Sequence, residues 1–160
     1  MKLLIESWRN FINEGHDSAP QIITVDFDDT IRMTDGGYPN TEVIDKIKQF
    51  KADGAKVYIV SSRKDTSDNK LFIDDFLDTN DISHDGIYLT DLKDKWYNVN
   101  ELGSDMHFDD DDEEFKAIKH HIEEFSEDKQ NIKLMKVDYE TGKVKEWKEE
   151  LDEVYTDKQR

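Results

Sequence analysis

The chain has 160 residues, of which 39 are acidic and 22 basic, for a formal net charge of -17. That length predicts one domain with a real core, and that charge disfavours nucleic acid phosphates unless basic residues cluster, which they do not. The absence of cysteine excludes disulfides, thiolate nucleophiles and Cys-ligated zinc, and it fits a reducing, cytoplasmic location. Without a run of about 18 apolar residues or a secretory signal pattern, we expect no membrane partner.

Residues 1–15 are expected to form an amphipathic helix ahead of a single domain over residues 16–160. The apolar side chains recur at helical spacing: Leu4, Ile5, Trp8, Phe11 and Ile12. Gly15 ends this pattern. Such a stripe either packs on its own domain or docks to a partner or to a second copy of the chain.

Strand and helix patterns alternate through the rest of the chain. The apolar run at 22–25 predicts a first strand, and further strands are predicted at 56–60, 86–89, 106–108 and 132–137. Helices are predicted at 41–54 with a cap at Asn40 or Thr41, at 71–77, at 95–102, around 115–125 and at 144–155, with a loop at 34–40. This alternation predicts parallel βαβ units in a three-layer, Rossmann-like α/β domain.

Two carboxylates follow the first predicted strand. Asp26 and Asp28 stand two residues apart, and Thr30 follows two residues later. Because the chain turns at a strand end, each carboxylate can aim separately at one point. Such a concentration indicates a divalent metal, a nucleophile, or both. An ordinary acidic strand-to-loop turn gives the same pattern in so acidic a chain.

The fourth predicted strand also ends in carboxylates, in an acidic run over residues 109–114. Asp112 and Glu113 are accounted for by a helix start, where the dipole stabilises acidic side chains. Asp109 and Asp110 come straight off the strand, and this reading explains them less well. The run lacks the spacing and central glycine of an EF-hand, which disfavours a calcium site.

Groups suited to phosphate lie between the two acidic sites. The second strand ends in Ser61, Ser62 and Arg63, and a guanidinium can bind a phosphate through two hydrogen bonds. Lys93 and Lys95 both precede the fourth strand, and the sequence favours Lys95 without deciding between them. Loop serines and surface lysines are common, so only the order of these groups along the chain gives them weight.

Taken in order, Asp26-x-Asp28-x-Thr30, Ser61, a lysine and Asp109-Asp110 resemble motifs I to IV of the haloacid dehalogenase (HAD) superfamily of phosphatases. Glu114 occupies the last acidic position of motif IV, where the family more often has aspartate. The resemblance implies a central parallel sheet of about five strands in the order 5-4-1-2-3, with helices on both faces. Strands 1 and 4 would then be neighbours, so their carboxylates would meet at one site. The gaps between motifs leave no room for a separate cap domain.

The resemblance also implies roles for these residues. Asp26 would be the nucleophile that forms an aspartyl-phosphate, Asp28 the general acid/base, and Thr30 a brace for the loop between them. Substrate phosphate would be bound by Ser61, Ser62, Arg63 and Lys93, with Ser61 and Lys95 stabilising the transferring group. Mg²⁺ would be held by the side chains of Asp26 and Asp110 and the carbonyl of Asp28, with Asp109 behind them or bound through water.

The substrate stays open at this stage. An uncapped site suits a bulky or polymeric phosphate, and Ser61-Ser62-Arg63 looks similar to the Ser-Gly-Arg of polynucleotide 3'-phosphatase domains. The net charge argues against a polyanion, which leaves a nucleotide or sugar phosphate, with residues 34–39 or an oligomer partner as a lid. The alternative from another class is a non-catalytic HAD-fold module that binds Mg²⁺ or a partner.

Overall fold

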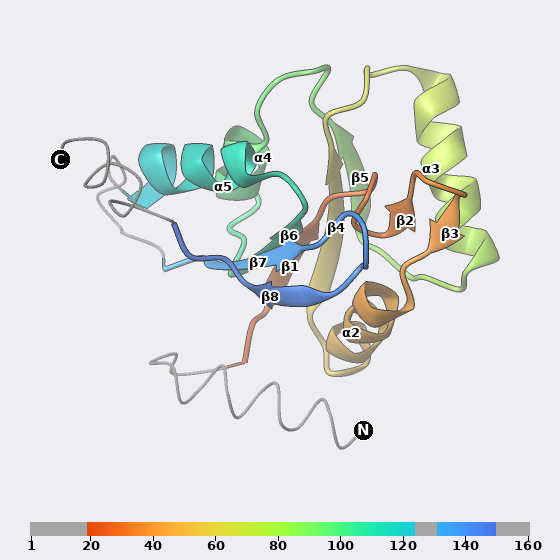
Figure 1. Cartoon of the computed structure of the whole chain (residues 1–160), viewed down its shortest axis with the longest axis horizontal. Coiled ribbons are helices and arrows are strands. Elements are labelled where there is room, and N and C mark those ends of the chain that lie inside the picture. The colour runs from red at the N-terminus through yellow and green to blue at the C-terminus, as the bar shows by residue number, and fades with distance from the viewer. Residues whose placement is uncertain (1–18, 124–130, 150–160) are drawn as a thin grey trace, which may run out of the picture.

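The computed structural model describes residues 19–123 and 131–149 (Figure 1). The predicted helix within residues 1–15 lies outside the described residues, as does the part of the predicted last helix beyond residue 149. Within the two described ranges, no helix combines the length and the apolar character that crossing a membrane would require.

A six-stranded sheet in the order β5-β4-β1-β6-β7-β8 forms the centre of the fold. Its strands are β1 (Ile22–Val25), β4 (Lys56–Ser61), β5 (Gly86–Leu89), β6 (Met106–Asp109), β7 (Lys133–Val137) and β8 (Val144–Glu146). All neighbours pair in parallel except β7 and β8, which are antiparallel. The mainly parallel α/β architecture is confirmed. The strand count and the full order differ from the prediction because β8 is added beside β7, while the five parallel strands keep their predicted neighbours.

The prediction of a helix from residue 144 is wrong at its start, because Val144–Glu146 is β8. A tight turn after β7 explains the difference. The Asp138 carboxylate accepts the backbone N–H groups of Glu140 and Thr141, and Gly142 adopts a left-handed φ of 76°. This turn reverses the chain onto β7, so Val144 packs against the core instead of starting a helix.

Helices cover both faces of the sheet, as predicted (Figure 1). They are α2 (Thr41–Ala52), α3 (Ser67–Thr79), α4 (Trp96–Glu101) and α5 (Asp112–Ile118), the last continued by a π-helical turn over Lys119–Glu123. Ile47 of α2 and Ile73 of α3 share one apolar cluster with Val25. Phe115 of α5 belongs to a second cluster and contacts the ring of His107. Alternation along β1 and β6 separates these two layers.

Residues 34–40, predicted as a loop, contain one strand of a small hairpin. Its strands are β2 (Arg32–Met33) and β3 (Tyr38–Pro39), which pair in antiparallel fashion. This β2–β3 hairpin connects β1 to α2 along the chain. Over the described residues, neither gap between motifs holds a cap domain. α3 begins four residues earlier than predicted because the Thr66 hydroxyl accepts the Asn69 N–H and caps it.

Asn40 links the hairpin to the turn after β7, although it gives α2 no side-chain cap. Its buried Nδ2 donates to the carbonyls of Thr30 and Gly142, both at 3.0 Å. We expect Asn40→Ala to lower the free energy of unfolding by about 1–3 kcal/mol, because two buried carbonyls lose their donor. Urea unfolding followed by circular dichroism measures the change. Lys48→Ala, on the exposed side of α2, is the control, and equal stability of the two variants would contradict the assigned role.

Candidate active site

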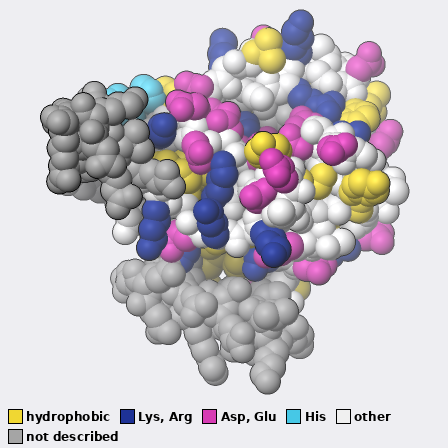
Figure 2. Space-filling view, viewed as in Figure 1, with side chains coloured by type: hydrophobic (Ala, Val, Ile, Leu, Met, Phe, Trp, Pro, Cys, Tyr) yellow, Lys and Arg dark blue, Asp and Glu magenta, His cyan; other side chains and the backbone are white. Residues whose placement is uncertain are grey.

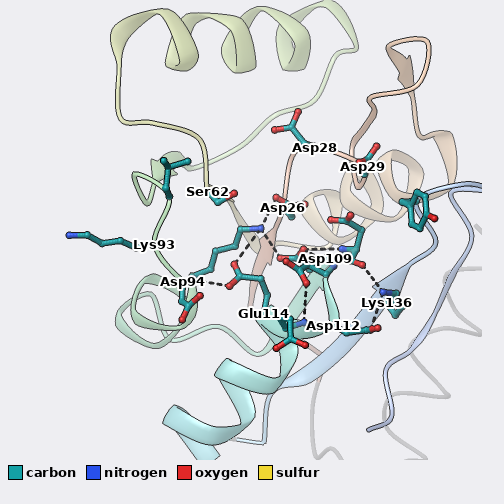
Figure 3. Close-up of a pocket in the computed structure, with 16 residues that line it drawn as sticks. Asp26, Asp28, Asp29, Ser62, Lys93, Asp94, Asp109, Asp112, Glu114 and Lys136 are labelled. Carbon is teal, nitrogen blue, oxygen red and sulfur yellow. Dashed lines mark hydrogen bonds and ion pairs between the residues drawn. The ribbon is translucent and has the colours of Figure 1, made fainter. Parts of the chain in front are cut away.

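A cavity of about 630 Å³ opens at the carboxyl ends of β1 and β6, where the winding of the sheet reverses (Figure 3). We call it the acidic cavity. Most of the residues predicted from the sequence line it: Asp26, Asp28, Ser62, Lys93, Lys95, Asp109 and Asp110. Thr30, Ser61 and Arg63 are not among the lining residues. The fold therefore brings the two predicted acidic strand ends to one place.

Lys95 joins these two strand ends. Its Nζ donates to Asp26 Oδ1 at 2.7 Å and to Asp109 Oδ2 at 2.8 Å, and all three side chains are buried. Burial by itself lowers the pKa of Lys95, but the two carboxylates outweigh it and raise that pKa above its ordinary range. The ammonium therefore stays charged. Lys93 is exposed and points away from the acids in Figure 3, so Lys95 is the lysine that reaches them.

The Asp26 carboxylate is held on both oxygens. Lys95 binds Oδ1, and the Thr30 hydroxyl donates to Oδ2 at 3.0 Å. The Asp26 N–H donates to the Phe108 carbonyl, which fixes the backbone against β6. Burial, followed by the charge of Asp109, raises the pKa of Asp26 well above its ordinary value, although Lys95 opposes this rise. One ammonium is thus not enough to neutralise the acids around it.

Asp109 is saturated with donors from the protein. Its oxygens accept from Lys95, from His107 Nε2 at 2.9 Å and from the N–H groups of Asp110 and Asp111. Burial alone raises the pKa of Asp109, but Lys95 and the hydrogen bond from His107 outweigh it and hold that pKa well below its usual range. Asp109 is therefore a permanent anion that orients Lys95.

His107 was not identified from the sequence. It is fully buried, and that burial lowers its pKa, so the neutral ring donates from Nε2 to Asp109. Its Nδ1 then accepts from the Thr24 hydroxyl, 2.8 Å away on the neighbouring strand β1. The signal was available in part, since residues two apart in a strand share one face and His107 precedes Asp109 by two.

Asp26, Asp109 and Asp110 offer carboxylate oxygens that lie within 4.8 Å of one another. Burial raises the pKa of Asp110 to about 6, with the charge of Asp109 acting in the same direction. Three crowded carboxylates facing one ammonium suit a divalent cation with oxygen ligands, such as Mg²⁺. Because Asp109 already accepts from four protein donors, Asp26 and Asp110 are the side chains best able to hold it.

A second unpredicted group fixes the loop that carries Asp110. Lys136, at the end of β7, donates from Nζ to the Asp110 carbonyl at 2.5 Å and to Asp112 Oδ1 at 2.9 Å. Trp147 Nε1 donates to the same Asp112 oxygen at 3.1 Å. The sequence carried one signal for this role, because Lys136 stands near the end of the strand that pairs with β6. The hydrogen bond from Trp147 could not be anticipated, because the segment from residue 144 was predicted as a helix and not as a strand beside β7.

Arg63 and Asp28, assigned separate tasks by the sequence, are bound to each other. The Arg63 Nε and Nη2 donate to the two Asp28 oxygens, each at 2.8 Å, which raises the pKa of Arg63. The guanidinium also lies 4.6 Å from the ring centre of Phe72 and 5.5 Å from that of Phe27. In Figure 3 the Asp28 carboxylate is directed away from Asp26. In this structure Arg63 therefore holds Asp28.

The two serines after β4 differ in position. Ser61 is buried, and its hydroxyl accepts the Arg63 N–H at 3.2 Å, so it shapes the turn. Ser62 is exposed and lines the acidic cavity. The sequence preferred Ser61 for phosphate, whereas Ser62 is the serine that reaches the lining.

Two solved structures of the Pnkp1/Rnl/Hen1 RNA repair complex contain a chain of similar fold. One matches with a TM-score of 0.61 and 19% identity, covering 78% of this chain and 44% of that chain. The other matches with a TM-score of 0.57 and 20% identity, covering 78% and 48%. This chain thus spans less than half the length of the chains it matches. No family model and no curated protein matches it. At these identities the likeness shows a shared fold.

Glu114 gives the site a pH-dependent stability. Its Oε2 lies 3.7 Å from Lys95 Nζ, and burial raises its pKa from 4.5 to about 7. Because ionisation is easier in the unfolded chain, the folded state loses stability as pH rises from about 4.5 to about 7, by roughly 1.4 kcal/mol per unit of pKa displacement.

We therefore expect Glu114→Gln to gain stability over the wild type across that interval, and the gap to stay constant above it. Urea unfolding at several pH values in a metal-free buffer measures the gap. Glu113→Gln, which alters an exposed neighbour in the same helix, should follow the wild type. A gap for Glu114→Gln that does not change with pH would contradict the raised pKa.

Proposed function

We propose that this protein is a magnesium-dependent phosphatase that hydrolyses phosphomonoesters through an aspartyl-phosphate on Asp26. The observation that carries the proposal is the ammonium of Lys95 between Asp26 and Asp109, at the ends of adjacent parallel strands. Asp110 stands beside them, with a carboxylate oxygen within 4.8 Å of theirs. This constellation matches the order of HAD-like motifs in the sequence. The shared fold supports the architecture, and the chemistry is argued from the site.

The position of Asp26 suits a nucleophile. Lys95 and Thr30 fix its two oxygens, so little orientation remains to be lost when a phosphate binds. Attack of one oxygen on phosphorus breaks the bond to the leaving oxygen and leaves an acyl phosphate on Asp26. Lys95 then stands beside the transferring group and stabilises its charge. Bound Mg²⁺ would neutralise the surrounding carboxylates and polarise the phosphoryl oxygens.

Proton transfer is assigned to Asp28. It gives a proton to the leaving oxygen and later takes one from the water that hydrolyses the acyl phosphate. The carboxylate must turn from Arg63 toward the acidic cavity, whose lining it already joins. Arg63 is thus a positioning residue that keeps Asp28 at the edge of the site between turnovers.

A phosphorylated polynucleotide end is a second candidate substrate, because the matched chains belong to an RNA repair complex. The charge of the site limits how much polymer it accepts. Lys93, Lys95 and Lys136 are the cations of the acidic cavity, and acidic residues outnumber them in its lining. On the face shown in Figure 2, acidic and basic side chains are interspersed. A nucleotide or a sugar phosphate therefore meets less repulsion than an extended polyanion.

Turnover separates the phosphatase from a non-catalytic binding module. With Mg²⁺, the wild type should hydrolyse p-nitrophenyl phosphate and an alkyl phosphate, whereas Asp26→Asn should lose turnover and the phosphoenzyme. Asp28→Asn should lose about 10²–10⁴-fold on the alkyl phosphate and less on p-nitrophenyl phosphate, whose leaving group needs little protonation. Asp29→Asn, which alters another lining carboxylate, is the control. A folded wild type inactive on nucleotides, sugar phosphates and phosphorylated oligonucleotides would reject the proposal.

Thermal stability tests the cation separately. Mg²⁺ should raise the melting temperature of the wild type, since a ligand of the folded state stabilises it by about 2.7 kcal/mol at 100 times its Kd. Asp110→Ala should remove this rise because it deletes a carboxylate of the cluster. Glu113→Ala removes an exposed carboxylate from the same cavity and should keep it. A full rise in Asp110→Ala would place the cation elsewhere.

A further inference from the structure

A second hollow of about 640 Å³ adjoins the acidic cavity, and we call it the side cavity. Leu92, Lys93 and Asp94 line both, so these residues form a common border between the two cavities. Trp96 and Tyr97, in the first turn of α4, complete the side cavity together with Thr90 and Asn98. A group attached to a phosphate beside Asp26 would pass this border, which includes the exposed Leu92, to enter the side cavity.

The side cavity contrasts with the acidic cavity in charge and in ring content. Lys93 and Asp94 balance each other there, and the other lining groups include two aromatic rings, an aliphatic side chain and an amide. Such a lining suits a flat, uncharged ring with polar edges. A second anionic group on the ligand would be repelled by the carboxylates of the acidic cavity. In the side cavity it would find Lys93 as the one basic lining residue, already balanced by Asp94.

The backbone holds Leu92 in an unusual conformation. Asp91 and Leu92 both have left-handed φ values, 56° and 68°, and neither is glycine. Such conformations are strained for residues other than glycine and persist where the surroundings enforce them. Here the Leu92 N–H donates to the Ser62 carbonyl at 2.8 Å and the Asp91 N–H to the Arg63 carbonyl at 3.2 Å. Strain and hydrogen bonds together present a leucine that is 68% exposed beside the acidic cavity.

Tyr97 is also presented rather than buried. It is 58% exposed, and its ring meets Trp96 edge-on with centroids 6.0 Å apart. Trp96 in turn stacks on His121 at 4.3 Å. The ring of Tyr97 thus has a rigid aromatic support behind it and an accessible surface. An apolar residue and an aromatic ring held in this way next to a phosphate site form a stacking platform.

We infer that the side cavity binds the base of a nucleotide whose phosphate lies beside Asp26, with Tyr97 stacking on the base. This inference rests on the proposed phosphatase function and names its substrate class. The separation of the cavities favours a nucleotide, since its ribose spans from the phosphate to the ring. A phosphotyrosine would place its ring directly in the acidic cavity, and a sugar phosphate offers no ring of π electrons to stack. Free nucleotides and polynucleotide ends share this chemistry.

The test compares substrates with and without a base. Adenosine 3'-monophosphate, a 3'-phosphorylated oligonucleotide and glycerol phosphate are hydrolysed with Mg²⁺ by the wild type and by Tyr97→Ala. Base stacking on an aromatic side chain predicts that Tyr97→Ala raises KM for the nucleotide about 5- to 100-fold more than KM for glycerol phosphate. Tyr97→Phe should keep the preference. Tyr88→Ala, on β5 outside both cavities, is the matched control.

The outcomes separate the two sources of the base. Equal losses on the nucleotide and the oligonucleotide support a platform for the terminal base, and their kcat/KM values then show which source is preferred. A loss confined to one of them assigns the platform to that source. Equal effects of Tyr97→Ala on adenosine 3'-monophosphate and glycerol phosphate, or no effect on any substrate, would overturn the inference.

A binding experiment keeps the inference testable if the protein turns over no phosphate ester, which would reject only the proposed function. Trp96 lines the side cavity and is one of three tryptophans in the chain, so a stacked base should quench its fluorescence. Adenosine 3'-monophosphate should quench the wild type, and both Trp96→Phe and Tyr97→Ala should reduce that quenching. Glycerol phosphate should not quench. Absence of binding by the wild type, or quenching that survives in Trp96→Phe, would overturn the inference.

Discussion

The buried ion pairs of Lys95 are the interaction on which the site depends. Parallel pairing sets Val25 of β1 opposite Phe108 of β6, so the acids that follow them emerge together at one edge of the sheet. Asp26 and Asp109 would repel each other there without a cation between them. Removing one partner of a buried pair costs about 3–5 kcal/mol, because the charge left behind is uncompensated. Lys95 makes the two strand ends compatible with one fold.

The hydrogen-bond donors that offset the negative charge of the site are distributed unevenly among its carboxylates. Asp109 accepts from four donors, including the neutral ring of His107. Asp26 receives only Lys95 and Thr30, and Asp110 is held through its backbone by Lys136. Among these three acids, the negative charge that the protein compensates least therefore lies on Asp26 and Asp110. That distribution distinguishes, within a single cluster, one carboxylate with many protein donors from two with fewer.

Much of this arrangement could be predicted from the sequence, because apolar runs mark the parallel strands and polar residues at their ends converge by topology. The strand order implied by the HAD resemblance brought Asp26, Asp109 and Asp110 together, and the order of the motifs favoured Lys95 without deciding against Lys93. Two of the misses have different physical causes. The pairing of Arg63 with Asp28 is set by side-chain packing between distant segments, and each residue alone had looked suited to a ligand. Strand β8 was missed because three residues carry too short a pattern to distinguish a strand from a helix.

The setting of Arg63 has a consequence for how this surface can change over evolution. Phe72 is 42% exposed on α3, yet its ring lies under Arg63 and also under Arg32 of the β2–β3 hairpin, 5.2 Å away. Through Arg63 it is two steps from the Asp28 carboxylate. The exposure of Phe72 suggests a position that tolerates substitution, but its ring contacts the guanidinium that binds Asp28. The outer surface of α3 is expected to vary least where this ring stands, and to vary freely at Asp68 and Asp75 on the same helix.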